Sequence, residues 1–427
     1  MLPVIPLSHP ATSGRPESVY RLPGFAAFLF ARLATVFAMQ IQAIVVAWQV
    51  YDITRDPMSL AYVGLAQFIP MLLLLAPAGD LIDRYNRKAI LSASWALSAI
   101  CSALLAWLSY SDAHPAGGIY AVLVLFGCAR AFMAPALQSL LPQIVPRERL
   151  AQSLATNSMI MKIGTIGGPV AGGALYAFGG PVAYLACLVC FLGGIVLLRR
   201  VQLLHAQQTA KAGAENKPLG IWQRFNEGIR FIWSHPIVLG AISLDLFAVL
   251  LGGVVALLPI YAQDILHVGP TGLGLLRSAM AVGEILTGLY LSTRPFNRRV
   301  GRTLFCAIFL FGSANLVFAF STAFWLSFVA LVVAGAGDMV NVYVRGALVQ
   351  YSTPDYLRGR VNAVNMLFIS SSNELGEFRA GSTAAAFGAV PAAAMGACFT
   401  LLIAGGMMWR VKELRNVDRF EDAAHAR

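Results

Sequence analysis

Residues 79–88 read GDLIDRYNRK and form a short charged segment between two long apolar runs. The runs cover about residues 59–79 and 89–110, and each has the roughly 20 apolar residues that a helix needs to cross a hydrocarbon core about 30 Å thick. Gly79 permits a tight turn or a close helix approach. We therefore expect a helical hairpin that crosses a membrane twice, with its turn held at the surface by basic side chains.

The whole chain has the composition of a membrane protein. Of its 427 residues, 58% are hydrophobic and 12% are charged, whereas soluble domains average about 45–50% and about 25%. So few charges cannot cover a water-facing surface, which excludes a soluble enzyme, a disordered chain and a secreted disulfide scaffold. The six cysteines lie inside apolar runs and the histidines show no ligand spacing, so we expect neither a disulfide framework nor a metal site.

Working outward from the hairpin with the same length criterion predicts twelve membrane-spanning helices, and therefore an all-α membrane protein. The spans of the first half are expected at about 24–50, 59–79, 89–110, 119–142, 151–178 and 181–198, and those of the second half at about 237–261, 270–293, 303–322, 324–350, 361–389 and 391–410. The expected organisation is a six-helix bundle in 1–198, a cytoplasmic linker in 199–236, and a second six-helix bundle with a cytoplasmic tail in 237–427.

The linker contains one amphipathic segment. Residues 219–233 place apolar side chains on one helical face and charged ones on another, which favours a helix lying on the cytoplasmic leaflet. An ordinary soluble linker helix is the alternative.

The distribution of basic residues predicts the orientation. Loops and tails assigned to one side hold 24 of the 31 Lys and Arg residues, and those of the other side hold only Arg55. Basic residues are retained on the cytoplasmic side of membrane proteins, so we expect both termini in the cytoplasm and the chain in the cell (inner) membrane. The same rule accounts for the net charge of +11 without nucleic-acid binding.

The two halves resemble each other at one offset. Pro146 and Asn157 recur 208 residues later as Pro354 and Asn365. This predicts a duplicated six-helix unit, the parallel repeat of some transporters.

Charged residues inside the predicted spans follow the same pattern in both halves. A charge in lipid costs at least about 2.5–3.5 kcal/mol, and every third predicted span (the third, sixth, ninth and twelfth) carries none in its interior. We interpret the charged spans as lining a path between two bundles, with buried structural ion pairs as the alternative for some residues. The candidates for carrying a coupled proton are Glu284, Asp338, Glu374 and Glu377. The candidates for binding substrate or forming ion pairs are Arg32, Arg130, Asp245 and Arg345.

The hairpin segment closely resembles the motif G-x-x-x-D-R-x-G-R-R/K of the major facilitator superfamily, with Asn86 where that family usually has glycine. In that family the loop is a conformational latch, a role that the resemblance assigns to Gly79, Asp83, Arg84 and Arg87. A second stretch is similar to the family's antiporter motif, in which small residues and a proline allow close helix packing. Its residues are Gly164, Gly168, Pro169, Gly172 and Gly173.

Two further stretches extend the resemblance. Arg130, in FGCARAFMAP, is similar to an arginine motif associated with proton handling, and residues 372–378, SNELGEF, resemble the branch that includes the enterobactin exporter. The resemblance implies a twelve-helix transporter that works by alternating access and is not an enzyme. Its implied activity is proton-coupled export, by antiport, of an organic small molecule such as a siderophore or drug.

Two other functions stay open: a proton-coupled uptake symporter or facilitator, and a non-transporting membrane sensor or scaffold. The sequence has no phosphate-binding G-x-x-x-x-G-K-[ST] motif, so we expect no nucleotide or other cofactor. The expected partners are a small-molecule substrate, protons and the lipid bilayer, and we expect a monomer that binds no nucleic acid.

Overall fold

The computed structural model describes residues 24–111, 116–146, 149–203, 221–354 and 356–425, and in this part of the chain every regular element is helical. The helices of the first half are α1 (Phe25–Thr54), α2 (Pro57–Arg84), α3 (Arg87–Tyr110), α4 (Ala116–Ile144), α5 (Leu150–Tyr176) and α6 (Gly180–Arg199). The short helix α7 (Ile221–Ser234) leads into the second half.

The second half begins with α8 (Pro236–Gly252) and the short turns η3 (Val255–Leu257), α9 (Leu258–Ile260) and η4 (Tyr261–Ile265). It continues with α10 (Gly269–Thr293), α11 (Val300–Phe320), α12 (Phe324–Ser352), α13 (Arg358–Phe387) and α14 (Ala389–Arg410), and ends with α15 (Lys412–Arg415) and α16 (Asp422–His425).

Ten helical segments of the described chain are long and apolar enough to cross a membrane. The other two expected spans, α5 and α13, are helices of 27 and 30 residues that are not among those ten. α13 carries several charged and polar side chains, so its hydropathy is low although its length is sufficient. All-helical architecture is confirmed, and both of these helices contact the opposite half of the chain, α5 through α10 and α13 through α2.

The predicted repeat is visible in the helix boundaries. α4 begins at Ala116 and α12 at Phe324, and α5 begins at Leu150 and α13 at Arg358. Both pairs of starting points are 208 residues apart, the offset of the sequence repeat.

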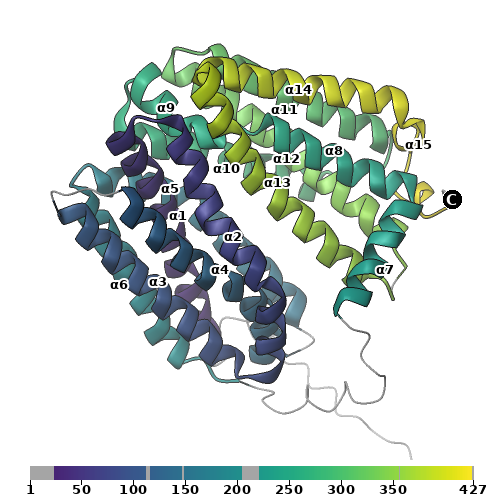
Figure 1. The fold of residues 1–427 in the computed structure, drawn as a ribbon. Coiled ribbons are helices and arrows are strands. Elements are labelled where there is room, and N and C mark those ends of the chain that lie inside the picture. The colour runs from purple at the N-terminus through teal and green to yellow at the C-terminus, as the bar shows by residue number, and fades with distance from the viewer. Residues whose placement is uncertain (1–23, 112–115, 147–148, 204–220, 355, 426–427) are drawn as a thin grey trace, which may run out of the picture.

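The helices form two bundles that lie together at one end and diverge toward the other (Figure 1). In the first bundle α1 packs against α5 and α6, and in the second α10 and α11 pack against α12. The bundles meet where α5 packs against α10 and where α2 packs against α13. These four helices therefore form the main contacts between the two halves.

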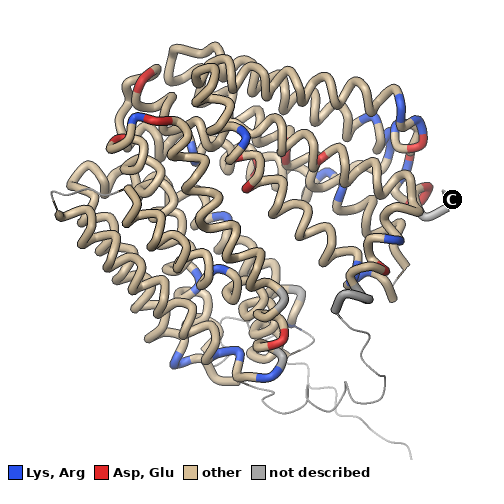
Figure 2. Tube along the Cα trace, viewed as in Figure 1, with Lys and Arg blue, Asp and Glu red and all other residues tan. Residues whose placement is uncertain are grey.

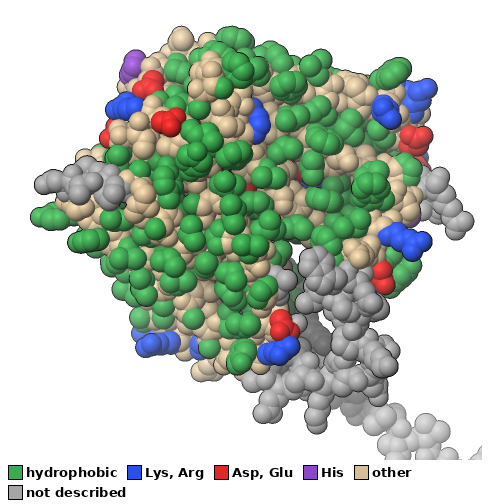
Figure 3. All heavy atoms as spheres, viewed as in Figure 1, with side chains coloured by type: hydrophobic (Ala, Val, Ile, Leu, Met, Phe, Trp, Pro, Cys, Tyr) green, Lys and Arg blue, Asp and Glu red, His purple; other side chains and the backbone are tan. Residues whose placement is uncertain are grey.

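The outer surface has the polarity of a membrane protein. Apolar side chains cover most of the face seen in Figure 3, and Lys and Arg gather toward helix ends and connections (Figure 2). Large apolar residues on the outside include Trp107, Leu289 and Leu402, each more than 60% exposed. Such a surface is stable in lipid and not in water.

The seventh span differs from the expected continuous helix at 237–261. α8 ends at Gly252, and residues 253–254 are not helical before η3 resumes the turn. Gly252 faces Thr400 of α14 so closely that a Cβ would collide with the Thr400 side chain. The glycine pair breaks a run whose hydropathy alone is that of an uninterrupted span.

α7 packs on protein where the sequence predicted contact with the leaflet. Phe231 and Ile232 are buried in a cluster with Val361 and Val364 of α13, and Glu227 forms an ion pair with Arg360. The expected contact with the leaflet is therefore wrong for this part of the apolar face. Leu219 of the predicted segment lies outside the described residues.

The C-terminal tail fastens the start of α11. The backbone N–H of Arg299 donates to Asp418 Oδ1 at 3.1 Å, and the N–H of Phe420 donates to Asn297 Oδ1 at 3.0 Å. The Phe420 ring stacks on Tyr351 with centroids 5.9 Å apart. The tail thereby joins the α10–α11 connection to α12.

Candidate functional site

A cavity of about 520 Å³ lies between the two bundles. It is lined from the first half by α1, α2, α4 and Met161 of α5, and from the second half by η3, α9, α10 and α13. Much of the wall is aliphatic, and it includes four methionines. These are Met39, Met71, Met133 and Met161.

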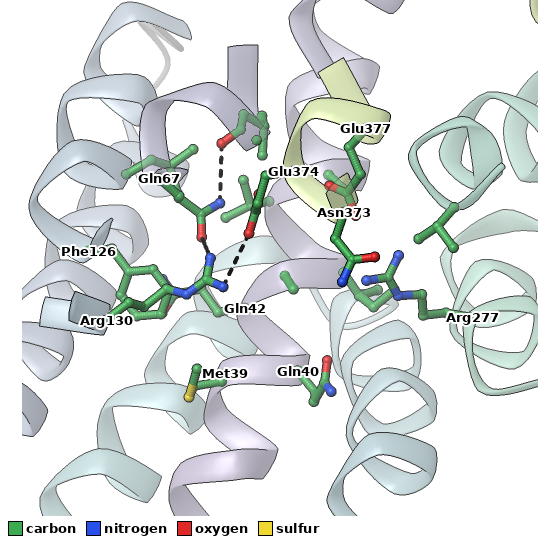
Figure 4. A pocket seen from close by; sticks show the side chains of 18 of the residues that line it. Met39, Gln40, Gln42, Gln67, Phe126, Arg130, Arg277, Asn373, Glu374 and Glu377 are labelled. Carbon is green, nitrogen blue, oxygen red and sulfur yellow. Dashed lines mark hydrogen bonds and ion pairs between the residues drawn. The ribbon is translucent and has the colours of Figure 1, made fainter. Parts of the chain in front are cut away.

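One ion pair spans this cavity. Arg130 of α4 donates from Nη2 to Glu374 Oε1 of α13 at 3.3 Å and from Nη1 to Gln67 Oε1 at 3.1 Å (Figure 4). The side chains are 27% and 15% exposed, so the pair is largely shielded from solvent. Gln67 in turn donates to the carbonyl of Val63 at 3.3 Å, which fixes its oxygen toward the arginine.

A second ion pair joins the halves beside the cavity. Lys162 Nζ of α5 lies 2.5 Å from Glu284 Oε2 of α10. The sequence predicts ion pairs between a basic first half and an acidic second half, and the described residues include three: these two and Arg55–Asp264, which lies away from the cavity lining.

Two arginines of the lining have no carboxylate within 4 Å among the described residues. Arg32 of α1 donates from Nη2 to Met161 Sδ at 2.6 Å. Arg277 of α10 lies beside Asn373, across the cavity from Arg130 (Figure 4). Arg277 is a charge inside the eighth predicted span, but it was not among the predicted site residues.

Glu377 also lines the cavity, one helical turn beyond Glu374. The carboxylates of both residues lie close to Gly64 of α2, since a Cβ built there would be 3.7 Å from Glu377 Oε2 and 3.8 Å from Glu374 Oε2. Both acids of α13 therefore lie against α2 of the first half at Gly64.

Asp245 and Arg345 form a pair inside the second bundle and outside the cavity lining. They are only 5% and 4% exposed, and Arg345 Nε lies 3.5 Å from Asp245 Oδ1. Asn341 donates to Asp245 at 2.6 Å, and Arg345 donates to Asn365 of α13 at 3.0 Å. Asp338 interacts electrostatically with the same pair. This arrangement is that of a buried structural cluster, the alternative that the sequence left open.

Arg379 occupies the break in the seventh span. Its guanidinium donates to the carbonyls of Leu250 and Gly253, each at 3.4 Å. These carbonyls lie at the end of α8, where the helix dipole is negative and carbonyl groups lack helical partners. Gly396 of α14 makes room, because a Cβ there would be 3.1 Å from the Arg379 guanidinium.

The hairpin segment is anchored mainly to its own bundle. Arg87 donates to the carbonyl of Ser139 at 3.1 Å, and Arg84 pairs with Asp80 one turn earlier in α2. The side chain of Asp83 lies outside the described part, and a Cβ on Gly79 would meet nothing within 4 Å. Asn86 has φ −62° and caps α3 through its side-chain oxygen, so its use here is capping and not the left-handed conformation of a glycine.

The glycine-rich stretch of α5 packs on two helices. Gly164, Gly168 and Gly172 face Val36, Gln40 and Ile41 of α1, so closely that a Cβ at any of them would crowd α1. On another face Gly173 lies against the Pro270 carbonyl of α10, and Gly274 of α10 lies against the carbonyl of Pro169. Small residues thus bring the two bundles into backbone contact.

A polar cluster joins the bundles at the end where they meet. Tyr51 donates to Asp264, and Arg55 lies 3.3 Å from Asp264 and 2.9 Å from Asp52. Gln263 donates to Asp52 at 2.6 Å. The sequence singled out Arg55 only as the lone basic residue of its side, so this cross-bundle cluster was not predicted.

Comparison with known proteins finds a matching family model and relatives that are named as efflux pumps, exporters and transporters. The family model described as a transmembrane secretion effector matches residues 17–427. The multidrug efflux pump Tap of Mycobacterium tuberculosis is 25% identical over 91% of this chain and 94% of its own. The enterobactin exporter EntS of Shigella dysenteriae is 27% identical over 92% and 93%. The staphyloferrin A transporter of Staphylococcus aureus is 24% identical over 75% and 79%.

Solved structures share the fold. A bacterial homologue of the iron transporter ferroportin, in an inward-facing state, has a TM-score of 0.69 at 20% identity and covers 94% of this chain and 100% of its own. A bacterial homologue of the lysosomal transporter Spinster has a TM-score of 0.70 at 14% identity, with coverage of 91% and 96%.

Proposed function

Since the chain belongs to the transmembrane secretion effector family of the major facilitator superfamily, a family of membrane transporters and not enzymes, we propose that it exports an organic small molecule in exchange for protons. The substrate class implied by the relatives is a siderophore or drug. The chain is proposed to lie in the cell (inner) membrane with both termini in the cytoplasm, following the distribution of its basic residues. A monomer is proposed as its oligomeric state.

The observation that carries this proposal is the Arg130–Glu374 pair across the cavity. It joins one helix of each bundle at the site where a substrate would lie, so its formation and loss would bias the two bundles toward different arrangements. Transporters of this architecture bind substrate between their halves and move one bundle against the other. In this account Glu374 carries the proton, with Glu377 beside it.

The pair can be opened in two ways. A proton on Glu374 removes its charge, and an acidic substrate group competes for Arg130. Either event frees the bundles to rearrange, whereas the empty, ionised cavity keeps them joined. Exchange of substrate for protons requires that the bundles rearrange when either one is bound and stay in place when neither is bound. An ion pair that either a proton or a substrate can break meets this requirement.

The other candidates have less support from their positions. Glu284 is held by Lys162 beside the cavity, and Asp338 and Asp245 belong to the buried cluster of the second bundle. We therefore assign Glu284 to holding α5 and α10 together, and Asp245, Asp338 and Arg345 to bundle stability. Gly79, Asp83, Arg84 and Arg87 are proposed as the latch of the α2–α3 hairpin.

Proteoliposomes with an imposed pH difference test the function, with enterobactin and ethidium as probes and a pH-sensitive dye reporting protons. We expect the probe and protons to move in opposite directions, and we expect Glu374→Gln to abolish coupled flux. Glu413→Gln, an exposed acid of α15, is the matched control and should behave as wild type. Movement in the same direction indicates symport, flux without protons indicates a facilitator, and no flux favours the sensor or scaffold.

A further inference from the structure

The charges of the cavity lining are unbalanced. The lining contains three arginines, Arg32, Arg130 and Arg277, and two acids, Glu374 and Glu377. Arg130 is paired with Glu374. Arg32 and Arg277 have no carboxylate within 4 Å in the described part of the chain, so the cavity offers two guanidinium groups whose charge is not neutralised by direct contact.

These two arginines come from different bundles. Arg32 belongs to α1 and Arg277 to α10. A guanidinium that has lost part of its water is stabilised by an acidic group, which it binds through two parallel hydrogen bonds. An anion that engaged both residues would contact both halves of the protein at once.

The rest of the wall is suited to an apolar body. Four methionine side chains line the cavity together with Val, Leu and Ile residues and Phe126. Methionine is flexible and polarisable, so it adapts to apolar groups of different shapes. The volume of about 520 Å³ falls within the range of roughly 300–1,000 Å³ that holds drug-sized ligands.

We propose that the cavity binds an amphipathic organic anion, with its acidic groups on Arg32 and Arg277 and its apolar body against the methionine-rich wall. This inference rests on the proposed transport function and names its substrate class. Arg277 is then a specificity-determining residue contributed by the second half. A neutral or cationic molecule of the same size would leave both guanidinium groups without an acidic partner.

Three probes with one fluorophore test the inference: dansyl-glutamate, which is a dianion, neutral dansylamide, and cationic dansylcadaverine. Binding to the purified chain is followed by dansyl fluorescence. We expect dansyl-glutamate to bind at least about tenfold more tightly than dansylamide, since hydrogen bonds between charged groups are the stronger class, and dansylcadaverine to bind most weakly.

Variants assign the effect to the two arginines. Arg32→Gln and Arg277→Gln should each weaken dansyl-glutamate binding about tenfold or more while leaving dansylamide binding unchanged, which also shows that the cavity is intact. Arg277→Lys should retain part of the preference, because it keeps the charge. Arg410→Gln, an exposed arginine at the end of α14, is the matched control and should bind all three probes as wild type does.

Equal affinity for the three probes, tighter binding of dansylcadaverine, or no binding of dansyl-glutamate overturns the inference. Loss of dansyl-glutamate and dansylamide binding together in the glutamine variants also overturns it, since the arginines would then act on the shape of the cavity. Flux of the same probes in proteoliposomes separates the two proposals. Selective anion binding without flux of any probe supports the inference and contradicts transport, and flux of dansylcadaverine alone does the reverse.

Discussion

Replacing Glu374 by glutamine tests whether one ion pair holds the two bundles in the arrangement of Figure 1. At 3.3 Å and an effective dielectric constant of about 20, the Coulomb attraction in the pair is about 5 kcal/mol. Desolvation of both groups offsets much of this. The glutamine keeps the shape, and its side-chain oxygen still accepts one hydrogen bond from Arg130, which also keeps the hydrogen bond that it donates to Gln67. We therefore expect a net loss of about 1–3 kcal/mol for this arrangement, or about a 5- to 150-fold change in the conformational ratio.

The change is measurable as a distance between the diverging ends of the bundles. Tyr85 at the end of α2 and Tyr356 before α13 are 66% and 76% exposed, so cysteines there would accept spin labels in a chain whose six native cysteines are replaced. Pulsed electron resonance should show a larger population of short distances in Glu374→Gln than in the parent. Lowering the pH should produce the same change in the parent, because protonation also removes the charge of Glu374, and should have less effect in the variant.

Glu413→Gln removes an acid outside the cavity and should leave the distance distribution unchanged. An unchanged distribution in Glu374→Gln itself, at every pH, would refute the reasoning, because the pair would then contribute nothing to the balance between arrangements. A shift in both variants would assign the effect to net charge and not to the pair.

Three further predictions concern contacts around the cavity. Gly274→Leu should lower the thermal unfolding midpoint strongly, because its side chain would collide with the α5 backbone. Gly406→Leu should not lower the midpoint, because a Cβ at Gly406 meets nothing within 4 Å. Equal midpoints in the two variants would contradict the proposed backbone contact. Asp264→Asn should change the conformational ratio by no more than about fivefold, since exposed ion pairs contribute about 0–1 kcal/mol, and labels at the closed end of the bundles check this. Phe420→Ala should speed hydrogen exchange at the start of α11, because loss of a buried Phe ring costs about 3–5 kcal/mol; unaltered exchange would argue that the tail does not fasten that helix.

The fold followed from the sequence wherever a local signal was enough. Hydropathy and length predicted the all-helical architecture, and the 208-residue offset between Pro146 and Pro354 recurs in the starting points of two pairs of helices. The break after Gly252 was not predicted, because the neighbouring residues are all apolar and a glycine pair does not change the hydropathy of such a run. The packing of α7 on α13 was not predicted, because an amphipathic face indicates burial without indicating whether lipid or protein covers it.

The sequence identified charged residues as candidates for the site, but it did not specify which of them contact one another. A charge inside a predicted span singled out Arg130 and Glu374, and the structure brings them together. The same criterion singled out Asp245 and Arg345, which pair inside one bundle, because a position within a span does not specify which way the side chain faces. Arg277 was overlooked for the same reason: its importance comes from facing the cavity, and helix rotation follows from packing between halves that the sequence does not display.

The central claim is that the cavity between the bundles opens to each side of the membrane in turn. A single cysteine at Met39, in a chain without other cysteines, can be treated with a membrane-impermeant maleimide from either side of oriented vesicles. We predict reaction from both sides, with an imposed pH difference raising one rate and lowering the other. Reaction from one side only under every condition would contradict the account.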